Sequence, residues 1–274
     1  MIKHYLAVSA LLLAPLSVHA TAWTLSSTTP PSGIASIKAY ATAQTTSTSG
    51  GALFQSATLQ SYPGLGVTAS NDLSNGSTGS PDHAIDNDGG RNTTTDNPID
   101  GAVDALLFQF NASTSLSSLS VNWVNGDADL SVLAYTGSLN SGALPTNADV
   151  SGESFANLLS RGWRFIGNYN MAVNTPKTIN TDNIYSSYWL VSAYTGAAGS
   201  GKGDAAGVLD FGNDYFKLSS ISGAACNGST TGGVCGNSGG GGGVGSVPEP
   251  TSLLLLASGI LGWRVNRKNH ALAA

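Results

Sequence analysis

The chain has 274 residues, of which only 10% are charged and 35 are glycine, a composition more typical of β-rich surface proteins than of helical cytosolic enzymes. Between Thr21 and Pro250 it carries 7 basic and 16 acidic residues, a formal net charge of −9. A body this acidic repels phosphate groups, so nucleic acid is excluded as a partner, whereas cations are attracted.

The N-terminus has the pattern of a signal peptide over residues 1–20. Lys3 gives it a positive start, an apolar stretch runs from Tyr5 to Leu16, and Val18-His19-Ala20 ends it with small residues around a cleavage site. We expect signal peptidase to cut after Ala20. The alternative interpretation is a buried N-terminal helix.

Residues 21–235 form the expected folded body. Short apolar or alternating runs, separated by turn-rich spacers, predict strands at 34–41, 53–62, 105–110, 116–124, 129–137, 163–170, 186–195, 207–213 and 214–223. The run GESFANLL at 152–159 is compatible with one short helix. Many short strands with such spacers predict an all-β fold, a two-sheet β-sandwich of the jelly-roll kind.

The spacer at 81–104 is the most acidic part of the body and the candidate calcium site. Asp82, Asp86 and Asp88 lie within seven residues and could supply part of the oxygen shell that calcium needs. Their spacing is not that of an EF-hand, and the alternative is a solvated loop whose Asp residues cap turns. A second acidic turn at 126–129, Gly-Asp-Ala-Asp, is expected to be a hairpin connection. Calcium is the one cofactor that the sequence suggests.

No catalytic site is expected. His83 is the single histidine between Thr21 and Pro250, so a Ser-His-Asp triad would have to use it, and no G-x-S-x-G stands at a strand-to-helix turn. Nothing singles out a pair of carboxylates for glycoside hydrolysis. An exposed row of aromatic side chains would support the alternative function, a calcium-assisted carbohydrate-binding module. The aromatic residues on expected strands are Trp123, Tyr135, Trp163, Tyr169, Tyr188, Trp189 and Tyr194, and most should be core.

Cys226 and Cys235 are the two cysteines of the chain. In an exported protein, a pair this close is expected to form a disulfide, with a stabilisation of about 2–3 kcal/mol from closing the short loop. A zinc site is the weaker alternative, because zinc prefers four ligands.

The composition then changes twice. Residues 236–246 are nearly all Gly and Ser and predict a flexible linker. The apolar run from Thr251 to Trp263 has 13 residues, short of the about 20 that cross a bilayer, so it predicts a marginal transmembrane helix. The basic end, Arg264, Arg267 and Lys268, would stay cytoplasmic, which leaves the body outside.

Pro248, Glu249 and Pro250 precede this run, and the two prolines favour an extended backbone that a processing enzyme can bind. Pro-Glu-Pro, a short span and a basic end, together residues 247–270, resemble the PEP-CTERM sorting signal of Gram-negative bacteria. The resemblance implies recognition by an exosortase, a membrane-embedded cysteine transpeptidase-like enzyme, and removal of the tail. The alternative is a plain C-terminal anchor.

The body also resembles a family of exosortase-dependent surface proteins. The matching segments are PDHAIDNDGG (81–90), DALLFQF (104–110), DLSVLAYTG (129–137), WRFIGNY (163–169), SSYWLVSAY (186–194) and DYFKLSSISG (214–223). The resemblance implies a surface-sorted protein, gives no catalytic residues, and suggests extracellular polysaccharide or the cell envelope as its setting. We therefore expect a non-enzymatic protein that is exported, transiently anchored by its C-terminal helix, and then placed on the cell surface or released.

Overall fold

The computed structural model describes residues 20–42, 51–69, 83–87, 102–137, 148–210 and 214–236, all within one compact unit, Val18–Ser238. Within these ranges, no helix has the length and hydropathy that a membrane crossing requires. The predicted signal peptide (except Ala20), nearly all of the linker, and the apolar run lie outside the described residues.

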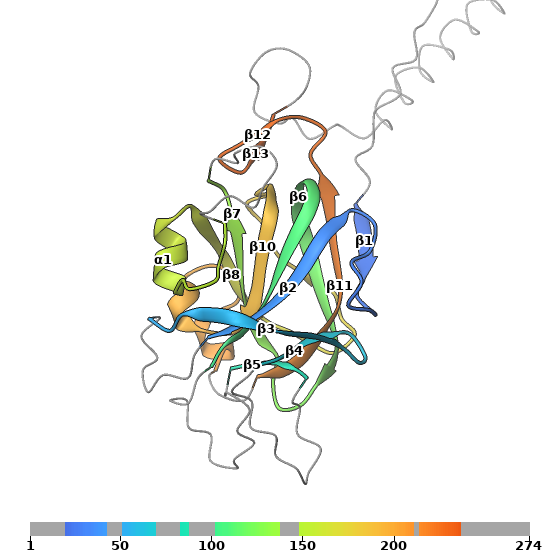
Figure 1. Cartoon of the computed structure of the whole chain (residues 1–274), viewed down its shortest axis with the longest axis vertical. Helices are drawn as coiled ribbons and strands as arrows, with labels where there is room; N and C mark the ends of the chain where they lie inside the picture. The colour runs from blue at the N-terminus through green and yellow to red at the C-terminus, as the bar shows by residue number, and fades with distance from the viewer. Residues whose placement is uncertain are drawn as a thin grey trace, which may run out of the picture. The chain divides into compact units, whose positions relative to one another are not determined.

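The described residues are mostly strands, with one α-helix and two short 3-10 helices (Figure 1). In chain order the elements are β1 (Thr21–Thr24), β2 (Ile34–Thr42), β3 (Phe54–Ser61), β4 (Leu65–Thr68), β5 (Ile85–Asp86), β6 (Asp104–Val124), β7 (Asp129–Tyr135), α1 (Phe155–Ser160), β8 (Trp163–Asn170), β9 (Lys177–Thr178), β10 (Ser186–Ala193), η1 (Gly196–Ala198), η2 (Ala206–Val208), β11 (Tyr215–Ala225), β12 (Thr230–Thr231) and β13 (Val234–Cys235).

The predicted two-sheet sandwich is wrong. Eleven strands form one sheet, ordered β1-β11-β4-β3-β2-β6-β10-β7-β8, with β5 paired to β11 and β9 paired to β6. Because β11 also pairs with β6, the five strands β11, β4, β3, β2 and β6 close into a ring. Strands β10, β7 and β8 extend the sheet from β6, beyond the ring.

The long strand β6 is the reason for this closure. The sequence suggested two strands at 105–110 and 116–124, but the polar stretch between them stays extended, and β6 runs unbroken for 21 residues. Its first part pairs with β2 on one side and β10 on the other, whereas Thr114–Val124 pairs with β11. One strand therefore belongs both to the extended sheet and to the closing edge of the ring.

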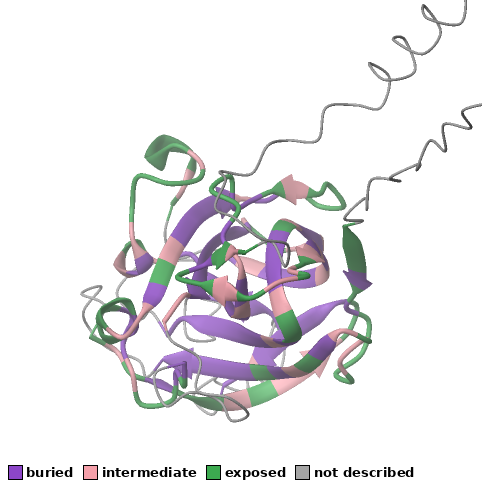
Figure 2. Ribbon diagram, turned by 90° about the horizontal axis from the view of Figure 1, so that it is seen from above, coloured by how far each residue is buried: buried purple, intermediate pink, exposed green. Residues whose placement is uncertain are grey.

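The core is built on strands with little exposed surface, as the purple runs in Figure 2 show. All seven residues of β7 are buried, and Trp189 on the neighbouring β10 is 0% exposed. Helix α1 covers part of this core. Ser154 caps it by accepting a hydrogen bond from the Asn157 backbone N–H, and Phe155 packs edge-to-face on Phe54, with ring centroids 4.9 Å apart.

One further predicted strand is wrong. Residues 207–213 include part of the short helix η2, and 211–213 lie outside the described residues. The first strand, β1, was missed because it has only four residues. It pairs with β11, where Trp23 faces Ile221.

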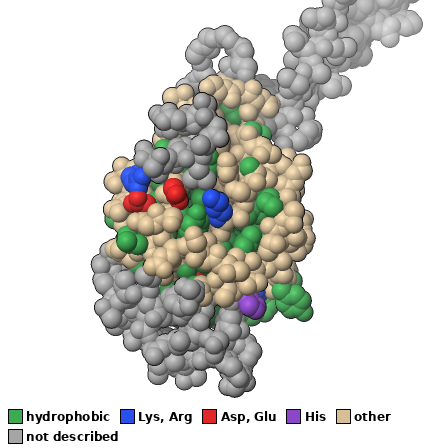
Figure 3. All heavy atoms as spheres, viewed as in Figure 1, with side chains coloured by type: hydrophobic (Ala, Val, Ile, Leu, Met, Phe, Trp, Pro, Cys, Tyr) green, Lys and Arg blue, Asp and Glu red, His purple; other side chains and the backbone are tan. Residues whose placement is uncertain are grey.

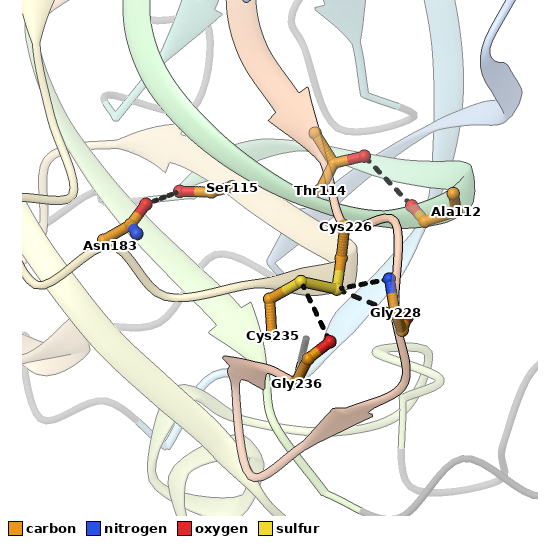
Figure 4. The surroundings of a disulfide bond; sticks show 8 residues. All are labelled: Ala112, Thr114, Ser115, Asn183, Cys226, Gly228, Cys235 and Gly236. Carbon is orange, nitrogen blue, oxygen red and sulfur yellow. Dashed lines mark hydrogen bonds between the residues drawn. A yellow bond between two sulfur atoms is a disulfide. The ribbon is translucent and has the colours of Figure 1, made fainter. Parts of the chain in front are cut away.

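A disulfide joins Cys226 and Cys235, whose Cα atoms are 5.6 Å apart (Figure 4). It closes a loop that contains the small sheet β12–β13, directly after the end of β11. The Cys226 N–H donates to the Ser113 carbonyl on β6 at 2.7 Å, which ties this loop to the ring.

Candidate functional site

Three buried or half-buried aspartates, two from one turn and one from a segment distant in the sequence, meet at one end of the sheet. Asp127 lies in the turn between β6 and β7, Asp129 is the first residue of β7, and Asp214 immediately precedes β11. One carboxylate oxygen from each lies within 4.8 Å of the others. These residues define what we call the three-aspartate cluster.

Backbone pairing holds the cluster in place. Asp127 and Asp214 form a parallel bridge, and the Tyr215 N–H donates to the Asp127 carbonyl at 3.1 Å. Gly126, with a φ of 84°, allows the tight turn that brings Asp127 back toward β11. The cluster therefore forms where the last residues of β6 meet the first residues of β11.

Asp214 is held by donors on two sides. Its Oδ1 accepts the Asp129 backbone N–H at 2.6 Å, and its Oδ2 accepts the Asn87 side-chain amide at 2.5 Å. The same Asn87 amide also donates to the Tyr194 carbonyl at 3.2 Å. All of these donors are neutral, so the hydrogen bonds orient the carboxylate without balancing its charge.

Asp129 is less completely satisfied. Its Oδ2 accepts the Asp210 backbone N–H at 2.8 Å, whereas its Oδ1 is buried and has no hydrogen-bond partner among the described residues. The whole residue is 0% exposed, so bulk water does not reach it. A buried carboxylate oxygen without a donor is costly, and either a proton or a bound cation would relieve that cost.

No positive side chain balances the cluster within the described ranges. The ion pairs found there involve other acids, and they are Arg161–Glu153, Arg164–Asp182, Lys177–Asp204 and Lys202–Asp182. The three-aspartate cluster thus gathers negative charge without a protein cation beside it.

The pKa values of two of these acids reflect that imbalance. Burial raises the pKa of Asp214 to about 9; the hydrogen bond from the Asp129 N–H partly offsets this, and the nearby charges of Asp129 and Asp127 add to it. Burial also raises the pKa of Asp129 to about 7, partly offset by the Asp210 N–H. Without a bound cation, the cluster therefore retains protons at neutral pH. A cation in the cluster would favour the ionised carboxylates.

The chemistry of the cluster is that of a hard-cation site. Its donor atoms are all oxygens, which calcium and magnesium prefer and which suit zinc less well. Asp129 and Asp214 are both 0% exposed, so a macromolecular substrate cannot contact them as it would contact catalytic carboxylates.

The predicted calcium ligands do not form this cluster. Asp86 is buried in β5 opposite Tyr215, while Asp82 and Asp88 lie outside the described residues, so that set stays a prediction. Its neighbour Asn87 does reach the cluster. The prediction that the turn at 126–129 is a hairpin connection is wrong, because β10 lies between β6 and β7 in the sheet. The turn supplies two of the three acids.

His83 and the aromatic residues on the predicted strands make contacts that fit structural roles. His83 is exposed, and its Nδ1 lies 2.9 Å from the Thr68 hydroxyl. Of the seven strand aromatics, six are at most 8% exposed, and Trp123 is half-buried. These seven side chains therefore belong mainly to the core and do not form an exposed sugar-stacking row.

The remaining predicted sites lie outside the described residues, but one of them is tested by comparison with known proteins. Residues 246–268 match the family model of the PEP-CTERM protein-sorting motif, which includes the proposed recognition residues and the basic end. No curated protein and no solved structure matches the chain, and the predicted resemblance of the body stays a prediction. The chain therefore carries a PEP-CTERM sorting signal, which implies that it is exported and sorted at the membrane in an exosortase-dependent way.

Proposed function

We propose that the protein is a non-enzymatic surface protein, which an exosortase processes at Pro248-Glu249-Pro250 and which then associates with extracellular polysaccharide or the cell envelope. The observation that carries the proposal is the sorting-motif match at 246–268. Signal peptidase acts first, after Ala20, and the apolar run after the motif holds the chain in the membrane until the second cut.

The described residues support the non-enzymatic part. Two of the three clustered aspartates are fully buried, and the single histidine among the described residues bonds a threonine hydroxyl. On the face shown in Figure 3, uncharged side chains and backbone make up most of the described surface. Such a surface suits contact with a neutral polysaccharide better than binding to a strongly charged partner. The burial of the strand aromatics argues against the alternative, a carbohydrate-binding module built on those residues.

The test of the sorting step is the C-terminal peptide mass of the protein purified from its own host. Wild type should end near Pro-Glu-Pro. The Glu249→Ala variant should keep Arg264, Arg267 and Lys268, because its motif no longer carries the charge that the enzyme recognises. Ser252→Ala, two residues beyond Pro-Glu-Pro, is the matched control and should be processed like wild type. Retention of the whole tail in wild type would refute exosortase processing and leave a plain anchor.

The polysaccharide association needs a separate measurement. The processed protein should sediment with purified extracellular polysaccharide of the host. An unrelated protein of similar net charge, which lacks the folded body at 21–235, should stay in the supernatant. Equal recovery of both proteins in the supernatant would remove the polysaccharide from the proposal and leave the sorting step intact.

A further inference from the structure

The three-aspartate cluster concentrates buried acidic groups without a cation among the described residues, and the sorting step gives this cluster no role. It joins three acids, from the turn after β6, from the start of β7 and from the entry to β11, in a place where buried charge is expensive. Acids alone are common on proteins and indicate no ligand. The buried Oδ1 of Asp129, which has no donor among the described residues, is the separate observation that points to a ligand.

We propose that Asp127, Asp129 and Asp214 bind one calcium ion, which takes the free Asp129 oxygen as a ligand and ties the closed ring to the rest of the sheet. Asp127 and Asp214 belong to segments that flank the paired strands β6 and β11 of the ring. Asp129 begins β7, which lies beyond β10 in the extended sheet. One ion at this point would hold both parts together.

The spacing of the donor atoms fits calcium. Calcium–oxygen bonds of about 2.3–2.6 Å allow two ligand oxygens to lie up to about 5 Å apart, and the three oxygens here lie within 4.8 Å of one another. Magnesium demands near-octahedral geometry with bonds of about 2.0–2.1 Å and gives up its water molecules reluctantly, so a buried group of three carboxylates suits calcium better. Calcium accepts six to eight oxygens, so water molecules on the side of the half-buried Asp127 would complete the shell.

The surrounding hydrogen bonds favour binding without a large rearrangement. The Asp129 N–H, the Asn87 amide and the Asp210 N–H already fix two of the carboxylates, so little freedom remains to be lost when the ion enters. Each bonded oxygen keeps a second lone pair that can face the metal. The site is therefore organised on strands and paired turns before the ion is present.

The test uses the full chain after removal of metal with a chelator. Titration with calcium chloride, followed by calorimetry, should show one tight site per chain, and calcium should raise the melting temperature by several degrees. Magnesium should bind at least tenfold more weakly. Absence of a calcium response in wild type, or an equal response to magnesium, would overturn the proposal.

Asp129→Asn and Asp214→Asn keep the side-chain shape and should weaken calcium binding at least tenfold, with loss of the thermal shift. Each variant should still unfold cooperatively in chelator, because the removal of buried negative charge offsets the hydrogen bond that one former carboxylate oxygen no longer accepts. If the Asp129 or Asp214 variant does not fold, Asp127→Asn still tests the site, because Asp127 lies in a turn and is only half-buried. Asp182→Asn is the matched control, since this exposed acid pairs with Lys202 and Arg164, and it should respond like wild type. An unchanged calcium response in all three cluster variants would place calcium elsewhere and refute this site.

Discussion

At the scale of single residues, Lys217 is an unusual charge. It lies on β11, is 6% exposed, and its Nζ donates to the His83 carbonyl at 2.6 Å and lies 5.8 Å from the centre of the Trp123 ring. The described residues contain no acid paired with it. Desolvation lowers the pKa of Lys217 to about 8, so the charged form is less favourable in the folded protein than in the unfolded chain.

This predicts a specific pH dependence for Lys217→Met. Between about pH 8 and 10.5 the unfolded chain binds the extra proton, so the Lys217 contribution to the free energy of unfolding rises with pH in wild type. The variant lacks that gain. Its stability relative to wild type should therefore be greatest below pH 8 and fall by up to about 3 kcal/mol as the pH approaches 10.5.

The measurement is urea unfolding of both proteins across that pH range. Lys38→Met, which removes an exposed lysine from β2, is the reference for loss of one positive charge. A difference between wild type and Lys217→Met that stays constant with pH would show that Lys217 is not desolvated.

At the scale of elements, the sequence predicted strands better than it predicted their connections. Residues 163–170 form β8 with the expected bounds, because apolar side chains and flanking turn residues mark both ends. The stretch Asn111–Ser115 was interpreted as a break, since Asn and Ser favour turns. Its backbone instead continues β6, and pairing with distant strands decides this point, which local sequence does not contain.

The packing of β4 on the segment before β5 gives an element-scale prediction. A Cβ atom on Gly66 would lie 1.6 Å from the His83 carbonyl oxygen, so the two backbones can pass only with glycine here. Gly66→Ala should lower the free energy of unfolding by about 3 kcal/mol or more, since overpacking forces the backbone to move. Gly207→Ala, where nothing lies within 4 Å, should be near neutral. Thermal unfolding compares them, and equal melting temperatures would contradict the close approach.

The candidate cation site shows the same limit of sequence reasoning. Sequence proximity pointed to Asp82, Asp86 and Asp88, whereas the cluster joins Asp127 and Asp129 to Asp214, 85 residues further along. The short spacing within 126–129 was visible, but the third acid depends on the pairing of β6 with β11. Only the topology brings these residues together, and the topology was the part predicted wrongly.

At the scale of the whole molecule, the folded body and the sorting signal are separate parts of the chain. The described residues lie within Val18–Ser238, and the sorting motif occupies 246–268, after the Gly-rich stretch. The tail could be interpreted from sequence alone, since a short linear motif needs no distant partner. The body could not, because its ring depends on pairings across more than 100 residues, such as Ser118 with Ser222.

This separation predicts that the tail acts without the body. Residues 236–274 fused to an unrelated exported protein should be cut near Pro-Glu-Pro in the same host, because a linear motif on a polar linker reaches the enzyme whatever fold precedes it. The C-terminal peptide mass of the fusion gives the answer, with Pro248→Ala plus Pro250→Ala in the fusion as the control that should keep its tail. If the native protein were cut and the fusion kept its tail, the exosortase would have to recognise the body as well. The surface of the folded domain would then be part of the sorting signal.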